Sequence, residues 1–229
     1  MKKRNLVIFT GAGISAQSGL KTFRDSDGLW EGYNVQEVAS PEGFAKMPYK
    51  VLDFYNMRRA QLGEVEPNEA HKICFKLEEL FDVKVITQNV DDLHERAGSR
   101  NILHLHGQLR SVRCTHNCFQ KIIDYGPIHV GDTCPSGHQL RPDIVWFGEE
   151  VPAMDEAINW VQSSDVFVVI GTSLQVYPAA SLLHFATGPV YIIDPSMHQN
   201  MANHQIIVIN KDAVNGTQEL YKILSRFVA

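Results

Sequence analysis

Five short apolar runs constrain the fold of this chain of 229 residues more than any other feature. They are LVIF at 6–9, VKVIT at 83–87, VFVVI at 166–170, VYII at 190–193 and IIVI at 206–209. Their β-branched residues and their lack of apolar–polar alternation are typical of strands that are buried on both faces. Helical patterns lie between them, which predicts an α/β fold with a parallel sheet.

Two helical patterns are clear. In NEAHKICFKLEELF, at 68–81, the apolar side chains recur at spacings of three and four and form one stripe, and Asn68 stands where an N-cap is expected. TQELYKILSRFV, at 217–228, repeats the pattern. The stretches 24–65 and 108–147 do not fit the alternation of strand and helix. We therefore expect both to be insertions that form a smaller lobe.

The composition excludes several classes of protein. Hydrophobic residues make up 44% of the chain and charged residues 21%, as in globular proteins that bury a core. The net charge of -5 and the absence of basic runs argue against a nucleic-acid partner. No apolar run approaches the roughly 18 residues of a membrane span, so we expect no membrane partner. The apolar run after the basic N-terminus is only five residues long, and it reads as a strand rather than as a signal peptide. We expect a monomer in the cytoplasm.

Each apolar run is followed by polar residues or glycine, and ligands of open α/β sheets bind at the carboxyl ends of the strands. After the first run, GAGIS at 11–15 is predicted to open a helix. Gly11 and Gly13 would let the backbone approach a pyrophosphate. The usual third glycine of a dinucleotide fingerprint is replaced by Ala16, so a simple tight turn is an alternative. A dehydrogenase would also carry an acidic residue after the second run, where this chain has Gln88 and Asn89, which argues against hydride transfer.

QNVDDLHERAG at 88–98 and LHLHG at 103–107 are dense in chemical groups. Asp91 can accept a hydrogen bond from an amide, and Asn89 can position a hydroxyl or a water. His106 ends a further short apolar segment and can serve as a general base near neutral pH. The alternative is a capping or packed histidine, which is the interpretation we favour for His104.

CTHNC at 114–118 and CPSGH at 134–138 resemble the two halves of a tetrahedral zinc site. The ligands would be Cys114, Cys118, Cys134 and His138. Alternatively, His116 replaces His138, Cys118 takes no part, or the cysteines are free thiols in a reducing compartment.

DFYNMRRAQLG at 53–63 reads as part of a helix. Tyr55 and Arg58 are three residues apart and share one face, whereas Arg59 must point elsewhere. A phenol and a guanidinium on one face can hold a carboxylate, because the guanidinium offers a planar fork of donors. An ordinary solvated helix surface is the alternative.

Taken together, the motifs GAGISAQSG, TFRD, QNVDDLHERAG, LHG, RPDIVWFGE and GTSLQVYPAA resemble, in order and spacing, those of the sirtuin family of NAD-dependent protein lysine deacylases. The resemblance covers nearly the whole chain. It implies a single catalytic domain of residues 1–229, with a Rossmann-like core (about 1–23, 66–107 and 148–229) and a smaller helical and zinc-binding lobe inserted as 24–65 and 108–147. The substrate peptide would lie in the cleft between them.

The resemblance also implies roles for individual residues. The NAD site would comprise Gly11, Ala12, Gly13, Ser15, Phe23, Arg24, Gln88, Asn89, Val90, Asp91, Gly171, Thr172, Ser173, Asp194 and Ala213. His106 would be the catalytic base and Asn89 a second catalytic residue. Val145, Trp146, Phe147 and Gly148 would pair with the substrate backbone as an added strand. One zinc ion would be structural.

In the family's mechanism, the acyl oxygen of an acylated lysine attacks C1′ of the nicotinamide ribose and expels nicotinamide. The base then helps a ribose hydroxyl to attack the resulting imidate, and O-acyl-ADP-ribose leaves. Sirtuins with a Tyr-x-x-Arg pair are similar to one another in preferring succinyl and malonyl groups, and Tyr55 and Arg58 match that pair. We therefore expect removal of acetyl groups and, preferentially, of acidic acyl groups from protein lysines. Mono-ADP-ribosyl transfer, a non-enzymatic NAD sensor and a zinc-containing nucleic-acid binder are the alternatives.

Overall fold

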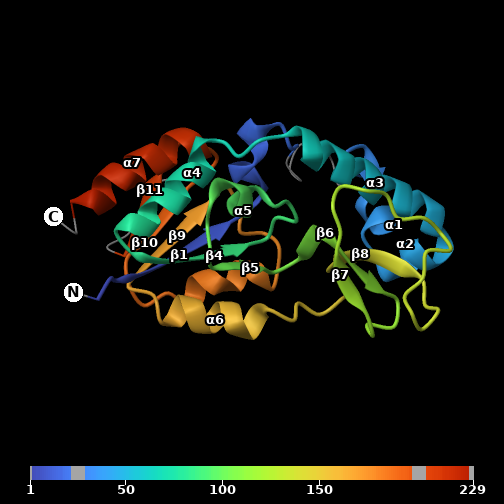
Figure 1. Ribbon diagram of the computed structural model, residues 1–229. Helices are drawn as coiled ribbons and strands as arrows, with labels where there is room; N and C mark the ends of the chain where they lie inside the picture. Colours follow the sequence, from blue (N-terminus) through green and yellow to red (C-terminus); the bar gives the residue numbers. More distant parts are fainter. Residues whose placement is uncertain (1, 22–28, 198–204, 227–229) are drawn as a thin grey trace.

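The fold is described from a computed structural model that covers residues 2–21, 29–197 and 205–226 (Figure 1). Its main sheet has six parallel strands in the order β11-β10-β9-β1-β4-β5. In chain order they are β1 (Asn5–Thr10), β4 (Asp82–Thr87), β5 (Ile102–His104), β9 (Val166–Ile170), β10 (Val190–Ile193) and β11 (Ile206–Ile209). All five predicted runs are strands, and β5 is the short apolar segment before His106. After β1, the chain adds β4 and β5 on one side of it and then β9, β10 and β11 on the other side. Rossmann folds have the same switch in strand order, and their ligands bind in the crevice at that point, here between β1 and β9.

Helices cover both faces of this sheet (Figure 1). α4 (Glu69–Lys76) and α7 (Ala213–Ser225) lie on one face, and α6 (Met154–Gln162) and the 3-10 helix η4 (Ala179–Phe185) on the other. Within β1, Leu6 and Ile8 belong to the first apolar core, whereas Val7 and Phe9 belong to the second. Burial on both faces is the physical reason why the runs contain no alternation.

The two predicted helices are found, with different ends. Asn68 caps α4, because its side-chain oxygen accepts from the backbone N–H of Ala70 at 2.9 Å. The regular helix ends at Lys76, and the 3-10 turn η3 (Leu77–Glu79) continues it. α7 begins earlier than predicted, where the side chain of Asp212 caps it by accepting from the backbone N–H of Asn215. The predicted end of this helix, at 228, lies outside the described residues.

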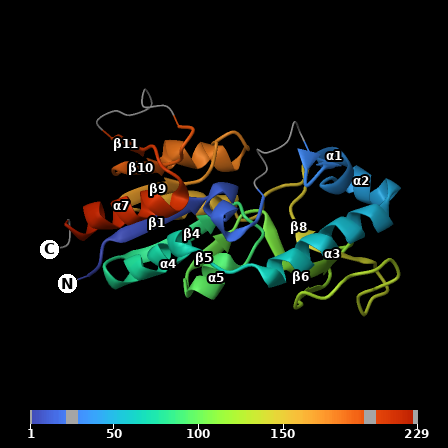
Figure 2. The same ribbon diagram turned by 90° about the horizontal axis from the view of Figure 1, so that it is seen from above.

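The smaller lobe lies beside the sheet, and both termini lie at the opposite end of the molecule (Figures 1 and 2). It contains the helices α1 (Val35–Val38), α2 (Pro41–Lys46) and α3 (Pro48–Glu64) and the hairpin of β2 (Leu29–Trp30) and β3 (Tyr33–Asn34). Its antiparallel sheet has the order β7-β6-β8, formed by β6 (Gly107–Cys114), β7 (Gln120–Ile122) and β8 (Leu140–Ile144). The predicted fold class is thus confirmed.

The described part of the chain contains no helix that is both long enough and apolar enough to cross a bilayer.

Candidate active site

A cavity of about 620 Å³ brings together residues from the carboxyl ends of the sheet strands and from the smaller lobe. Most of the predicted NAD-site residues line it: Ala12, Gly13, Ser15, Gln88, Asn89, Val90, Asp91, Gly171, Thr172, Ser173, Asp194 and Ala213. The predicted base and substrate residues line the same cavity: His106, Tyr55, Arg58, Val145, Trp146, Phe147 and Gly148. Gly11 does not line it, and Phe23 and Arg24 lie outside the described residues.

The glycine-rich segment after β1 opens a helix, as predicted, but the helix is a short 3-10 helix and not an α-helix. It forms two 3-10 turns, η1 (Ala12–Ile14) and η2 (Ala16–Ser18), joined at Ser15. The cause is a close approach to the end of β9, where the Gly13 N–H donates to the Gly171 carbonyl at 2.8 Å. A Cβ on Gly13 would lie 2.6 Å from the Gly171 Cα. The glycine at 13 is therefore required by the packing of the protein backbone on itself.

Ser15, Asn89 and Asp91 form one buried hydrogen-bond network. The Ser15 hydroxyl donates to the Asp91 carboxylate at 2.9 Å and accepts from the Asn89 amide at 3.1 Å. The Asn89 amide also donates to the Gly11 carbonyl at 3.2 Å. Burial raises the pKa of Asp91, while the hydrogen bond from Ser15 works against that rise. The network fixes both polar side chains at the cavity wall, where they can orient a bound carboxamide and a hydroxyl or water.

Gln88 presents a donor that the protein does not satisfy. Its Nε2 is buried and has no hydrogen-bond partner among the described residues, while its Oε1 lies 3.5 Å from the Thr172 hydroxyl. A buried donor without a partner costs about 1–3 kcal/mol, unless a ligand or water pairs with it. Because Gln88 lines the cavity, this orphaned amide fits a polar ligand such as a ribose.

His106 has the geometry of a neutral base. Its Nδ1 lies 3.1 Å from the Gln88 carbonyl, and a carbonyl can only accept, so Nδ1 carries the proton. Nε2 therefore keeps its lone pair. Burial lowers the pKa of His106, and the Gln88 carbonyl only partly offsets this effect. The imidazole is thus neutral at pH 7 and can take a proton.

Two buried histidines behind the cavity were not identified from the sequence. Nε2 of His71, on α4, lies 3.4 Å from the Ser15 hydroxyl, and burial lowers the pKa of His71 to about 4. His94, on α5 (Leu93–Ala97), stacks edge-on against it with ring centroids 5.0 Å apart. The sequence contained one sign of His71: it is a histidine within the apolar stripe of 68–81, three residues after the N-cap Asn68.

Tyr55 and Arg58 lie on α3 as predicted, but they are buried, so the alternative of a solvated helix surface is wrong. Tyr55 is 0% exposed, and its hydroxyl accepts from Trp146 Nε1 at 2.9 Å. Arg58 is 5% exposed, and its Nη1 donates to Glu31 at 2.7 Å and to Gln61 at 2.6 Å. Sequence reasoning missed Glu31, because its contact with Arg58 joins segments 27 residues apart.

The neighbouring Arg59 points away from Arg58, as predicted. Its Nε donates to the Leu109 carbonyl on β6 at 2.7 Å. Its side chain therefore links α3 to the small sheet, and of the two arginines only Arg58 lines the cavity.

The segment 145–148 already uses part of its backbone within the protein. The Val145 N–H donates to the His106 carbonyl at 2.9 Å, and the Phe147 N–H donates to the Ala39 carbonyl at 3.0 Å. The Trp146 N–H donates to the Glu149 carboxylate at 2.8 Å. These bonds hold the segment at the cavity, but its pairing with a substrate backbone stays a prediction.

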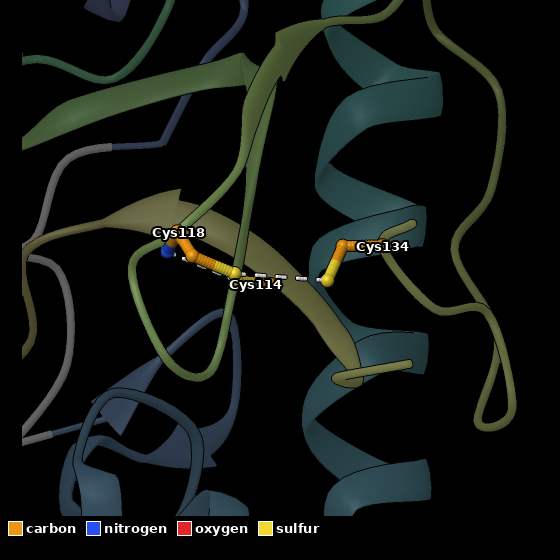
Figure 3. Close-up of side chains that lie close together, drawn as sticks. All are labelled: Cys114, Cys118 and Cys134. Carbon is orange, nitrogen blue, oxygen red and sulfur yellow. Dashed lines mark hydrogen bonds between the residues drawn. The ribbon is translucent and has the colours of Figure 1, made fainter. Parts of the chain in front are cut away.

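Three of the four predicted metal ligands come together (Figure 3). The sulfur atoms of Cys114, Cys118 and Cys134 lie within 4.8 Å of one another, with 3.4 Å between the first two and 3.9 Å between the last two. Thiolates around a tetrahedral zinc are about 3.8 Å apart, because each Zn–S bond is about 2.3 Å. The three cysteines therefore fit zinc, and the alternative in which Cys118 takes no part is not supported.

His138 does not join this group, in contrast to the prediction. Its ring stacks on His116, with centroids 3.7 Å apart and planes 16° apart. Its carbonyl accepts from the Cys134 N–H at 2.8 Å, which closes the turn and sets the backbone there. The spacing C-x3-H alone could not reveal this side-chain direction.

Comparison with known proteins assigns this arrangement to one group. The model of the Sir2 family matches residues 11–178. An NAD-dependent protein deacylase of Helicobacter pylori strain 26695 is 54% identical over 219 residues, which cover 95% of this chain and 96% of that protein. An NAD-dependent protein deacylase of Bacteroides thetaiotaomicron is 49% identical over 229 residues, which cover 96% of this chain and 98% of that protein.

Solved structures agree with the sequence comparisons. A Sir2 homologue in complex with NAD superposes with a TM-score of 0.86 at 40% identity, over 99% of this chain and 91% of the other. A complex described as Sir2, p53 peptide and NAD+ gives a TM-score of 0.77 at 30% identity, over 98% of this chain and 95% of the other.

Proposed function

Because this chain belongs to the Sir2 family, we propose that it is an NAD-dependent protein-lysine deacylase that removes acetyl and, preferentially, acidic acyl groups such as succinyl and malonyl. The observation that carries the proposal is the cavity itself. A neutral histidine with a free Nε2, an unsatisfied glutamine donor and the fixed Asn89 and Asp91 all line it. The smaller lobe supplies a buried tyrosine and arginine on the other side.

NAD is the co-substrate in this proposal. The orphaned Gln88 amide and Thr172 would hold a ribose, and Asp91 would hold the nicotinamide carboxamide. Asn89 would position the ribose hydroxyl or a water. The acyl oxygen of the substrate attacks C1′ of the nicotinamide ribose, and the C1′–nitrogen bond breaks to release nicotinamide. His106 then takes up, on its Nε2, the proton of a ribose hydroxyl while that oxygen attacks the imidate carbon. The lysine amine takes up a proton and leaves, and a water adds to the cyclic acyl cation that remains, so the products are free lysine and O-acyl-ADP-ribose.

The acyl preference rests on Arg58 and Tyr55. A terminal carboxylate of the acyl chain would accept from the Arg58 guanidinium and from the Tyr55 hydroxyl. Burial raises the pKa of Tyr55, so the phenol keeps its proton and can donate. A hydrogen bond to a charged group contributes about 1.5–3 kcal/mol. Two such bonds would favour succinyl over acetyl by roughly one to three orders of magnitude in kcat/KM, at about 1.4 kcal/mol per decade.

Paired kinetics test this proposal. One peptide is presented as its acetyl-lysine and succinyl-lysine forms, with NAD, to the wild type and to Arg58→Met. We expect the wild type to prefer the succinyl peptide, and the variant to lose that preference while it keeps deacetylation. Arg100→Met is the matched control, because the Arg100 side chain is 78% exposed and does not line the cavity.

A preference for acetyl in the wild type that Arg58→Met leaves unchanged would contradict the acidic preference alone. Failure to release O-acyl-ADP-ribose from either peptide would contradict deacylation and favour ADP-ribosyl transfer or an NAD sensor. The zinc ion of this proposal is structural and is held by the three cysteines. A monomeric state and a cytoplasmic location stay predictions.

A further inference from the structure

The carboxylate of Glu31 already pairs with one nitrogen of the guanidinium that the substrate would need. Its Oε1 accepts from Arg58 Nη1 at 2.7 Å, and its Oε2 lies 3.4 Å from Lys21 Nζ. The side chains of Glu31 and Arg58 are 12% and 6% exposed, whereas that of Lys21 is 69% exposed. The stronger contact of Glu31 is therefore the buried one with Arg58, and the contact with Lys21 faces water.

The backbone holds Glu31 at this place. Trp30 pairs with Tyr33, so Glu31 and Gly32 form a two-residue hairpin turn. Both have positive φ, 51° and 81°. Such turns favour glycine, asparagine or aspartate, and a glutamate in the first position is unfavourable for the local backbone. The stabilisation that offsets this unfavourable backbone comes from the Glu31 carboxylate, which the turn places next to Arg58 on α3. The Trp30 ring also lies 5.6 Å from the Arg58 guanidinium carbon.

This arrangement changes what a substrate meets in the cavity. Glu31 and Arg58 neutralise each other when the acyl group is uncharged, so an acetyl-lysine does not leave a buried guanidinium without a partner. Glu31 and Gln61 both bind Nη1 of Arg58, so a succinyl or malonyl carboxylate on the remaining N–H groups would share the guanidinium with Glu31, and the two like charges would repel each other.

We propose that Glu31 is an internal counter-carboxylate that competes with the acyl carboxylate of the substrate for Arg58, and so sets the acyl range of the enzyme. It pairs with Arg58 when neutral acyl groups are bound and gives way, toward Lys21, when a dicarboxylic acyl group enters. This inference rests on the proposed function, since it assigns the specificity of the same cavity. No bond is made or broken, and only hydrogen-bond partners are exchanged.

Removal of the Glu31 charge tests the competition. In Glu31→Gln, we expect the ratio of succinyl to acetyl kcat/KM to rise by about tenfold or more, which is the loss of one competing charge-assisted hydrogen bond. The change should appear in the KM of the succinyl peptide, with kcat nearly constant. Glu31→Gly should change the ratio in the same direction, and glycine adopts the positive φ of this position without strain.

Two further variants show whether Glu31 acts through Arg58. In the Arg58→Met background, Glu31→Gln should leave the ratio unchanged, since the guanidinium for which the carboxylates compete is gone. Glu37→Gln is the matched control, because it removes a carboxylate of the same lobe that pairs with Lys50 and does not line the cavity. This control should leave the ratio as it is in the wild type.

Affinity of the succinyl peptide, measured by calorimetry without NAD, gives a readout that is independent of turnover. We expect tighter binding to Glu31→Gln than to the wild type, and no change for the acetyl peptide. An unchanged ratio in both Glu31 variants, while Arg58→Met abolishes the succinyl preference, would overturn the Glu31 inference and leave the proposed function intact. An effect of Glu31→Gln that persists without Arg58 would overturn it as well. If Arg58→Met changes nothing, the acidic preference fails first and the inference fails with it.

Discussion

His106, the proposed base, shows how much of a site residue can be inferred from its position in the chain. The sequence places a histidine just after a short apolar segment and before a glycine, and that position predicts a base at a strand end. The sequence does not contain the tautomer or the protonation state. Both depend on the Gln88 carbonyl, 18 positions earlier in the chain, and on burial by surrounding elements. The tautomer and the protonation state of His106 therefore depend on how the ends of neighbouring strands pack around it.

The pH dependence of turnover tests this account of His106. In the proposed mechanism the neutral imidazole is the active form, and burial places its pKa below the ordinary value of about 6.5. With an acetyl-lysine peptide, kcat/KM should therefore keep its plateau to a lower pH than an ordinary imidazole would allow, and it should fall as the pH drops through the lowered pKa. His106→Gln should lose about 10²–10⁴-fold in kcat/KM.

His104 provides the control for this profile. Burial lowers the pKa of His104, but the hydrogen bond and the charge of Glu95 outweigh burial and raise the pKa above its usual value. If His104 controlled the reaction, the acid limb would lie above pH 6.5 and would move in His104→Gln. Either result would contradict the assignment of the limb to His106.

At the scale of elements, the segment after β1 shows why a motif can indicate a ligand site without specifying its conformation. Glycine at 11 and 13 is compatible with a helix, a turn or a close contact. The structure selects tight 3-10 turns, because the chain order of the sheet places the end of β9 beside β1. No local pattern at 11–15 contains that neighbour. The position of the site follows from the strands, and the shape of the loop follows from strand order.

A pair of glycine substitutions tests the close approach. In Gly13→Ala, the new Cβ would meet the Gly171 backbone at 2.6 Å, and backbone atoms of two strand ends cannot move aside. We expect a loss of unfolding free energy of about 1–3 kcal/mol, as for overpacked sites, together with weaker NAD binding. Denaturant unfolding and calorimetric titration with NAD measure the two effects.

Gly126→Ala is the matched control, since a Cβ there meets nothing within 4 Å. It should change the unfolding free energy by no more than about 0.5 kcal/mol. Equal stability of the two variants would show that the contact between Gly13 and Gly171 does not constrain the chain as described.

At the scale of the whole molecule, the cavity depends on two bodies with separate apolar cores. One body is the six-stranded sheet with helices on both faces, and the other is the smaller lobe with its own core around Tyr55 and Trp146. The hydrogen bond between Tyr55 and Trp146 spans 91 positions and joins α3 to the segment that follows β8. The cysteine cluster joins the end of β6 to the segment that leads into β8.

Metal removal tests the role of the cysteine cluster. The purified protein should contain about one zinc per chain by elemental analysis, and a strong chelator should lower its Tm, because thiolates held together without a metal repel one another. Cys114→Ser should lose the metal. Cys74→Ala should retain it, because Cys74 is buried in the core of the main sheet and lies outside the cluster.

His138→Ala tests whether His138 is a zinc ligand, as the spacing predicted, or lies outside the ligand set, as in the structure. The stacking of His138 on His116 implies that this variant retains its zinc. Loss of zinc from His138→Ala would instead restore His138 as the fourth ligand and contradict the ring position described above.

Short-range patterns in the chain specify the local features of this protein. Strands with no apolar–polar alternation, a capped amphipathic helix and polar residues after each strand are short-range patterns, and they were sufficient for the α/β class and for the edge of the sheet that carries the site. The ordered motifs were sufficient for the resemblance to the family, which the comparisons confirmed. Four features follow from the folded arrangement instead: the burial of Tyr55 and Arg58, the pairing of Arg58 with Glu31, the neutral state of His106 and the exclusion of His138 from the cysteine cluster. Each of them depends on which side chains meet across large separations in sequence, and on how far burial removes them from water.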